Sequence, residues 1–291
     1  MKPVRKAVFP VAGLGTRVLP ATKTIPKEML TVVDRPLIHY VVEEARAAGI
    51  EHFVFVTGRG KAAMEDYFDH HVELEATLQK KGKTALLEAL TAALPKEGEI
   101  SYVRQMQPLG LGHAVWCARD VIGDEPFAVL LPDMIMDADP AALRQAVDAY
   151  ERRGGNIVVV EPCPPGQAHQ YGIVALAERE DRVARMTGMV EKPAPGTEPS
   201  NLFISGRYIL QPEIFRHLGE RQAGAGGEIQ LTDAMAKLMA EQDFFALEYE
   251  GTTYDCGDKI GLLRANVAMA LKRPDLADAA RAAITPLLAG G

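Results

Sequence analysis

A glycine-rich stretch, Ala12-Gly13-Leu14-Gly15-Thr16-Arg17, directly follows the first expected strand of the chain. Glycines at such a position let the backbone approach a phosphate and turn its N–H groups toward the anion. Two further cations, Lys23 and Lys27, follow closely. Cationic side chains beside a bare glycine backbone form a site for a polyanion such as a triphosphate. A solvated turn with surface cations is the alternative.

Carboxylates near the ends of two expected strands form a second group. Asp133 ends the apolar run Phe127–Leu131. A carboxylate there is a suitable ligand for Mg²⁺, which takes one or two carboxylates together with substrate phosphates. A turn or helix-cap role is the alternative for Asp133. In the far half, Asp255 and Asp258 are both candidates for a second ligand, but Asp258 also suits the N-cap of a helix that begins near Lys259.

Two polar loops offer groups that could select a base and a sugar phosphate. Gln105 carries both a donor and an acceptor, which matches the edge of uracil, and Gly110 permits close approach to a flat base. Lys192 is a compact cation that can hold a phosphate as a point charge. Glu191 can accept hydrogen bonds from sugar hydroxyls. Each loop alone is equally typical of an ordinary surface turn.

The elements that must position these residues alternate between β-branched runs and amphipathic helical stretches in the first half. This alternation predicts a mostly parallel sheet with helices on both faces and ligands at the carboxyl ends of its strands. The expected strands are Lys6–Val11, His52–Thr57, Ile100–Arg104, Phe127–Leu131 and Asn156–Glu161. The expected helices are Pro36–Ala48, Lys61–Phe68, His113–Arg119 and Pro140–Arg153.

The remaining segments interrupt or complete this pattern. Residues 70–94 look like two helices separated near Gly82, and we interpret them as an insertion or lid. Several strands of the second half are expected to pair antiparallel: Gly172–Leu176, Val183–Val190, Asn201–Ile209 and Phe244–Tyr249. Helices are expected over Glu228–Glu241, Lys259–Arg273 and the Ala-rich tail from Pro274 until Gly290.

Composition excludes several classes of protein. The chain has 291 residues, 47% of them hydrophobic, which excludes disorder as its main state. Its net charge of −7 argues against a general nucleic-acid binder, which would need excess Lys and Arg. No apolar run is long enough to span a membrane, and no signal peptide is evident. Three widely spaced cysteines, without a CxxC pair, favour a reducing cytoplasm.

The motifs occur in an order that resembles the sugar-1-phosphate nucleotidylyltransferase family, from about residue 8 to residue 265. The glycine loop and Pro26-Lys27-Glu28 carry the first part of the resemblance. The later matches are Gln105 with Pro108–Ala114, Leu131-Pro132-Asp133, Tyr171-Gly172, Val190–Pro193, Gly227–Asp233 and Tyr254–Asp258. Any one motif is weak or moderate evidence, whereas the ordered set is specific.

The resemblance implies a role for each matching residue. Nucleotide binding is implied for Ala12, Gly13, Gly15, Thr16, Glu28, Gln105 and Gly110, and sugar-phosphate binding for Gly172, Glu191, Lys192, Gly206 and Glu228. Asp133 and Asp255 would hold Mg²⁺, and Arg17, Lys27 and Lys192 would act in catalysis. The histidines are given no role.

The implied fold is a single Rossmann-like α/β domain with a mixed, mostly parallel sheet flanked by helices, a helical insertion and a small antiparallel sugar-binding part. About residues 1–160 form the nucleotide-binding half, with the insertion at 70–94. About residues 161–258 form the sugar-phosphate half, and about 259–291 form C-terminal helices that could contact another subunit. Within the family, a homodimer or homotetramer is expected.

The implied reaction is Mg²⁺-dependent transfer of UMP from UTP to α-D-glucose 1-phosphate, which gives UDP-glucose and pyrophosphate. UDP-glucose generally feeds polysaccharide and glycan synthesis. A relative that uses dTTP or another sugar 1-phosphate is one alternative, and a non-catalytic nucleotide-sugar-binding regulator is another. An NAD-dependent oxidoreductase is disfavoured because Val18 stands where a dinucleotide fingerprint needs its third glycine. Neither a nucleic acid nor a membrane is an expected partner.

Overall fold

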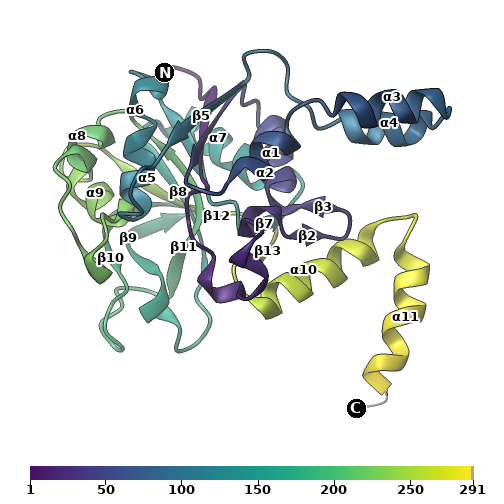
Figure 1. Cartoon of the computed structure of the whole chain (residues 1–291). Helices are drawn as coiled ribbons and strands as arrows, with labels where there is room; N and C mark the ends of the chain where they lie inside the picture. The colour runs from purple at the N-terminus through teal and green to yellow at the C-terminus, as the bar shows by residue number, and fades with distance from the viewer. Residues whose placement is uncertain (290–291) are drawn as a thin grey trace.

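Strands from both halves of the chain join one mixed sheet, in the order β5-β4-β1-β6-β11-β8-β12-β10-β9 (Figure 1). The computed structural model describes residues 1–289, with the backbone alone for residues 178–180 and 289. The strands are β1 Lys6–Pro10, β4 His52–Thr57, β5 Ile100–Arg104, β6 Phe127–Leu130, β8 Asn156–Pro162, β9 Gly172–Glu180, β10 Val183–Glu191, β11 Leu202–Leu210 and β12 Phe244–Glu248. Two further pairs of strands, β2 Thr31–Val32 with β3 Arg35–Pro36 and β7 Met134–Asp137 with β13 Thr252–Asp255, form small separate sheets.

The sheet separates two hydrophobic layers because its strands alternate their side chains. In β4, Phe53 and Phe55 pack into one layer, and Val54 and Val56 pack into the other. The first layer is covered by α1 Leu37–Ala47, α2 Ala62–Tyr67 and α7 Ala142–Arg153. The second is covered by α5 Leu111–Cys117, α6 Arg119–Ile122, α8 Ile214–Gly219 and α9 Leu231–Leu238.

The parallel part of the sheet follows the expected alternation of strands and helices. β5, β4, β1 and β6 all run parallel, so their carboxyl ends lie at one edge. β11 interrupts this arrangement because it pairs antiparallel with both β6 and β8. The predicted mixed, mostly parallel α/β sheet and the antiparallel pairing in the second half are therefore confirmed. The short strands β2, β3, β7 and β13 and helix α8 were not predicted, since segments this short carry little periodicity.

The 3₁₀ turns lie mainly in the loops around the carboxyl edge of the sheet. They are η1 Thr16–Val18, η2 Ala21–Lys23, η3 Lys27–Met29, η4 Ala168–Gln170 and η5 Ala225–Gly227. The first three follow the glycine loop, so the cations of that region stand on tight turns.

Two helical appendages leave the body of the molecule (Figure 1). The insertion forms a hairpin of α3 Val72–Lys80 and α4 Thr84–Thr91, and neither helix contains a buried residue. At the C-terminus, α10 Lys259–Lys272 packs on β13 and β2, and α11 Ala277–Ala289 projects away from the body. The expected end of the tail helix at Gly290 lies outside the described residues. Among the described helices, none is long and apolar enough to cross a membrane.

Candidate active site

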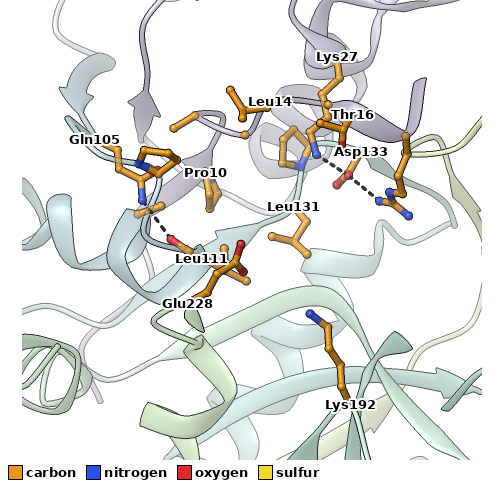
Figure 2. A pocket seen from close by; sticks show the side chains of 18 residues that line it. Pro10, Leu14, Thr16, Lys27, Gln105, Leu111, Leu131, Asp133, Lys192 and Glu228 are labelled. Atoms are coloured by element: carbon orange, nitrogen blue, oxygen red, sulfur yellow. Dashed lines mark hydrogen bonds and ion pairs between the residues drawn. The ribbon is translucent and has the colours of Figure 1, made fainter. Parts of the chain in front are cut away.

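A cavity of about 740 Å³ opens at the carboxyl edge of the parallel strands (Figure 2). This position agrees with the expectation that ligands gather where β1, β5 and β6 end. Most of the predicted site residues line it. They are Ala12, Gly13, Gly15, Thr16, Arg17, Lys27, Gln105, Gly110, Asp133, Lys192 and Glu228.

The glycine loop forms one wall of the cavity and keeps its amides free. Within the described part of the chain, no N–H group from Ala12 to Arg17 donates to a protein acceptor. Gly15 has a φ of 66°, and a Cβ there would stand 3.0 Å from the Cβ of Lys27. A side chain at Gly15 would therefore be strained and crowded, whereas glycine lets the loop fold tightly against η3. The arrangement suits a cradle for phosphate oxygens.

Four charged side chains meet at the next wall. The Nζ of Lys27 lies 2.7 Å from Oδ2 of Asp133 (Figure 2). The Arg17 guanidinium bridges Asp133 at 3.6 Å and Asp255 at 3.4 Å. Burial opposes ionisation of Asp133, but Lys27 and Arg17 outweigh it and hold the pKa of this carboxyl below its usual value. Burial raises the pKa of the Asp255 carboxyl, and the nearby negative charge of Asp133 adds to this rise against the opposing effect of Arg17. The two cations thus favour the ionised form of Asp133, whereas burial and the neighbouring carboxylate oppose ionisation of Asp255.

Pairing of β7 with β13 brings these two carboxylates together. Asp133 immediately precedes β7, Asp255 ends β13, and the Cys256 N–H donates to the Asp133 carbonyl at 2.8 Å. A Cβ placed on Gly257 would lie 2.3 Å from Nη2 of Arg17, 2.8 Å from Asp255 Oδ1 and 2.9 Å from Asp133 Oδ2. Glycine at this position therefore leaves the room that the Arg17 guanidinium and the two carboxylates occupy together.

The pairing of β7 with β13 also distinguishes the roles of Asp255 and Asp258, the two candidate metal ligands in the second half of the chain. The Asp258 side chain accepts hydrogen bonds from the N–H groups of Ile260 and Gly261, both at 2.8 Å, and so caps α10. Asp255 is the carboxylate that lies beside Asp133.

A third wall of the cavity is built around Gln105. Its Nε2 donates to the Gly110 carbonyl at 3.1 Å and to Nδ1 of His113 at 3.0 Å, which leaves its Oε1 available as an acceptor. Figure 2 shows the Gln105 side chain at this wall. Burial lowers the pKa of the His113 imidazole, which keeps the ring neutral and Nδ1 able to accept. Gly110, with a φ of 107°, allows Glu228 to approach, because a Cβ there would lie 2.8 Å from the Glu228 Cβ.

Gly172 and Glu191, two of the predicted sugar-phosphate residues, pair with each other next to Lys192 but do not themselves line the cavity. Thr232 Oγ1 donates to Oε2 of Glu191 at 2.7 Å, and a Cβ on Gly172 would crowd that same oxygen at 3.0 Å. Gly172 therefore leaves room around the Glu191 carboxylate. Lys192 lines the cavity and extends its ammonium into it from the opposite side to Asp133 (Figure 2).

Two predicted residues lie behind the cavity. Glu28 is fully buried, and one of its oxygens accepts from Lys61 at 2.7 Å. Lys61 also donates to the Gly13 carbonyl at 2.8 Å, so this buried pair supports the glycine loop from below. Gly206 packs against the side chain of Leu131, where a Cβ would stand 3.0 Å from Cδ1.

Sequence reasoning missed Lys61, Thr232 and His113, which contact predicted residues without standing in the loops that carry them. Lys61 was placed at the start of an expected helix, and Thr232 inside one. His113 was assigned no role, although its spacing from Gln105 across one tight turn was a usable signal. The missing information is tertiary, because each of these partners belongs to another element.

We predict that Lys61→Met destabilises the protein by about 3–5 kcal/mol, because it leaves Glu28 buried without its partner. Burial raises the pKa of the Glu28 carboxyl above its unfolded value, so ionising this group costs stability as the pH rises through that unfolded value. The decrease in the free energy of unfolding caused by Lys61→Met should therefore be larger at about pH 8 than at about pH 5. Urea unfolding at both pH values measures it. Lys83→Met, at an exposed position of the helical hairpin, is the matched control, and a pH-independent loss would contradict the assignment.

Comparison with known proteins agrees with this site. The family model described as nucleotidyl transferase matches residues 6–271. A curated UTP–glucose-1-phosphate uridylyltransferase of Bacillus subtilis is 52% identical over 278 residues, which cover 96% of this chain and 95% of that protein. The protein of the same name from Staphylococcus epidermidis is 47% identical and covers 99% of both chains.

Solved structures give the same result. The UTP-bound UGPase from Acinetobacter baumannii superposes with a TM-score of 0.90 at 45% identity and covers 97% of this chain and 99% of its own. A UDP-glucose pyrophosphorylase complexed with UDP-glucose has a TM-score of 0.82 at 41% identity, covering 93% of this chain and 100% of its own. The chain therefore belongs to the nucleotidyl transferase family, in the group that contains the UTP–glucose-1-phosphate uridylyltransferases.

Proposed function

We propose that this protein transfers UMP from UTP to α-D-glucose 1-phosphate, forming UDP-glucose and releasing pyrophosphate. The observation that carries the proposal is that Arg17, Lys27 and Asp133 meet beside a free glycine loop in one cavity with Lys192. Asp255 adjoins this group through its ion pair with Arg17. Relatives named UTP–glucose-1-phosphate uridylyltransferase match nearly the whole chain. Polyanionic substrates need this kind of environment, because charge must be neutralised before two phosphates can approach.

UTP fits the wall made by the glycine loop and Gln105. The free N–H groups of residues 12–17 offer donors to the phosphate oxygens. The free Oε1 of Gln105 can accept from the N3–H of uracil, while His113 and the Gly110 carbonyl hold the amide in that orientation. Glu28 and Lys61 act indirectly, since they set the position of the loop.

Glucose 1-phosphate fits the opposite side. The Lys192 ammonium is placed to bind the sugar phosphate as a point charge. Glu191, oriented by Thr232, can accept from hydroxyls of the hexose, and Gly172 gives the ring room. The two substrates would then face each other across the cavity.

The chemistry that this arrangement supports needs no general base. The second pKa of a phosphomonoester is about 6, so the attacking oxygen is already ionised at neutral pH. That oxygen forms a bond to the α-phosphorus of UTP, and the bond to the bridging oxygen breaks, so pyrophosphate leaves with the electron pair. Lys192 holds the attacking phosphate, and Arg17 and Lys27 neutralise the departing one, so positioning and charge stabilisation supply the catalysis.

Mg²⁺ is the cofactor we propose, with Asp133 and Asp255 as its protein ligands. Two neighbouring carboxylates, both ion-paired to Arg17, suit Mg²⁺, which takes one or two carboxylates together with waters and phosphate oxygens. No group of three or more His, Cys, Asp or Glu that could hold a metal occurs in the described part of the chain. When bound, the ion would be held by Asp133 and Asp255 and would supply positive charge that offsets the charge of the substrate phosphates.

We further propose a homo-oligomer in the cytoplasm, without a nucleic-acid or membrane partner, whose product feeds polysaccharide or glycan synthesis. Leu287 and Leu288 in the projecting α11 are 77% and 80% exposed, and adjacent exposed leucines suit a contact between subunits. Light scattering of the full chain would measure the number of subunits.

Pyrophosphate release tests the reaction itself. Purified protein with Mg²⁺, UTP and glucose 1-phosphate should release pyrophosphate, and release should stop when either the sugar phosphate or the metal is omitted. UTP should be preferred over ATP, CTP and GTP, and over dTTP by a smaller margin, since one methyl group is worth only about 1–3 kcal/mol of discrimination. Absence of release with every nucleotide from folded protein would refute the proposal.

We expect Asp133→Asn to lower turnover by roughly 10²–10³-fold, in the range seen when one electrostatic contact to the transition state is removed. An uncharged amide cannot neutralise a divalent cation as a carboxylate does. The same assay gives the rate, and circular dichroism shows whether the fold is retained. Asp258→Asn, at the α10 cap, is the matched control and should keep most of the activity. Normal turnover in Asp133→Asn would remove this residue from the metal site.

Lys192→Ala should raise the KM for glucose 1-phosphate much more than the KM for UTP, because only the sugar phosphate lies on its side of the cavity. Steady-state kinetics with each substrate varied in turn separates the two effects. Equal increases in both constants would count against a specific contact with the sugar phosphate.

A further inference from the structure

Arg207 is a fully buried cation that lies outside the cavity and has no part in the reaction described above. It stands in β11, the antiparallel strand between β6 and β8. Burying a guanidinium is expensive unless its charge and all five N–H donors are satisfied. The hydrogen-bond partners of the guanidinium indicate which parts of the structure it holds in place.

Glu44 of α1 supplies the opposite charge. Arg207 Nε lies 3.0 Å and 3.1 Å from the two Glu44 carboxylate oxygens, and Nη2 lies 2.7 Å from Oε2. Glu44 is itself fixed, because its Oε1 also accepts the backbone N–H of Leu143 at 3.0 Å. The guanidinium is therefore held between two helices on one face of the sheet.

The remaining donors bind the backbone around Asp133. Nη1 donates to the Leu131 carbonyl at 3.0 Å and to the Gly206 carbonyl at 3.1 Å. Nη2 donates to the Met134 carbonyl at 2.7 Å. Leu131 and Met134 are the first and last residues of the tight turn that presents Asp133, closed by a Met134 N–H bond to the Leu131 carbonyl at 3.3 Å. One rigid planar group thus spans both ends of this turn.

Gly206 explains how β11 delivers this side chain. Its φ of 87° lies in the left-handed region, and the pairing of β11 with β8 is irregular between Ile204 and Tyr208. Such a bulge redirects a neighbouring side chain, and bulges occur often beside active sites. Gly206 also accepts the Leu131 N–H at 2.9 Å, so the bulge and the turn are joined directly. The predicted glycine thus has a structural link to the metal-ligand turn.

We propose that Arg207, oriented by Glu44, is a positioning residue that sets the geometry of the Asp133 carboxylate for Mg²⁺. The inference rests on the proposed function, in which Asp133 holds the metal. Groups that orient a metal ligand from behind commonly change metal affinity by about 10–100-fold when mutated. Lysine at this position would keep the charge opposite Glu44, but a single ammonium cannot bind both ends of the turn and the carboxylate in this planar geometry.

The test measures metal binding directly rather than activity alone. Mn²⁺ is titrated into the full-length protein in the presence of UDP-glucose, and electron paramagnetic resonance reports the free ion. Arg207→Lys should weaken Mn²⁺ binding by roughly 10–100-fold and raise by a similar factor the Mg²⁺ concentration needed for half-maximal turnover. Ile209→Val is the matched control, because Ile209 lies two residues along β11, is fully buried in the apolar core and pairs with Ala128 and Ile157. It should lower the melting temperature without changing Mn²⁺ affinity.

The outcomes separate this inference from the proposed function. If the unmodified protein binds no Mn²⁺, or Asp133→Asn binds it equally well, the metal site itself is refuted and the inference falls with it. If Asp133→Asn loses binding but folded Arg207→Lys retains normal affinity, only the positioning role is overturned. Should Arg207→Lys fail to fold, Glu44→Gln decides by the same affinity criterion, since it keeps an acceptor for Leu143 and removes the charge that aligns Arg207. Failure of both variants to fold would overturn the positioning role in favour of a purely structural one.

Discussion

Four charges meet at the point where β7 and β13 pair, and the rest of the site depends on keeping them there. Asp133 and Asp255 repel each other in a partly buried environment, and Lys27 and Arg17 compensate. Backbone pairing fixes the two carboxylates, so the repulsion cannot be relieved by moving one of them away. A fixed pair of carboxylates beside two cations is well suited to a reaction whose main difficulty is bringing anions together.

Buried ion pairs behind the cavity support this arrangement. Lys61 with Glu28 holds the glycine loop, and Arg207 with Glu44 holds the Asp133 turn. A buried pair contributes little net stability compared with well-packed apolar residues. Each pair here orients a loop that faces the cavity, because its cation binds a backbone carbonyl of that loop. Apolar side chains could fill the same space but could not orient those carbonyls.

The appendages are separate from this machinery. The hairpin of α3 and α4 contributes no lining residue to the cavity and contains no buried residue. The arm formed by α11 likewise leaves the body. The cavity is lined by the sheet, its loops and the start of α5.

The sequence by itself determined the elements and most of the residues that face the cavity. The alternation of β-branched runs with amphipathic helices predicted the strands at Lys6, His52, Ile100 and Phe127, because periodicity is a local property. The loops after those strands had to share one edge, so Gln105 and Asp133 could be placed together in advance.

Only the tertiary structure decided which groups touch. The choice between Asp255 and Asp258 rested on resemblance until the pairing of β13 with β7 placed Asp255 beside Asp133 and left Asp258 to cap α10. The tertiary structure likewise decided that Lys61, Thr232 and Arg207 orient Glu28, Glu191 and the Asp133 turn. Only the contact of His113 with Gln105 had a local signal, their short spacing in the chain. Each of these contacts joins two different elements, and short strands and side-chain partners across a fold leave no periodic signal in the chain.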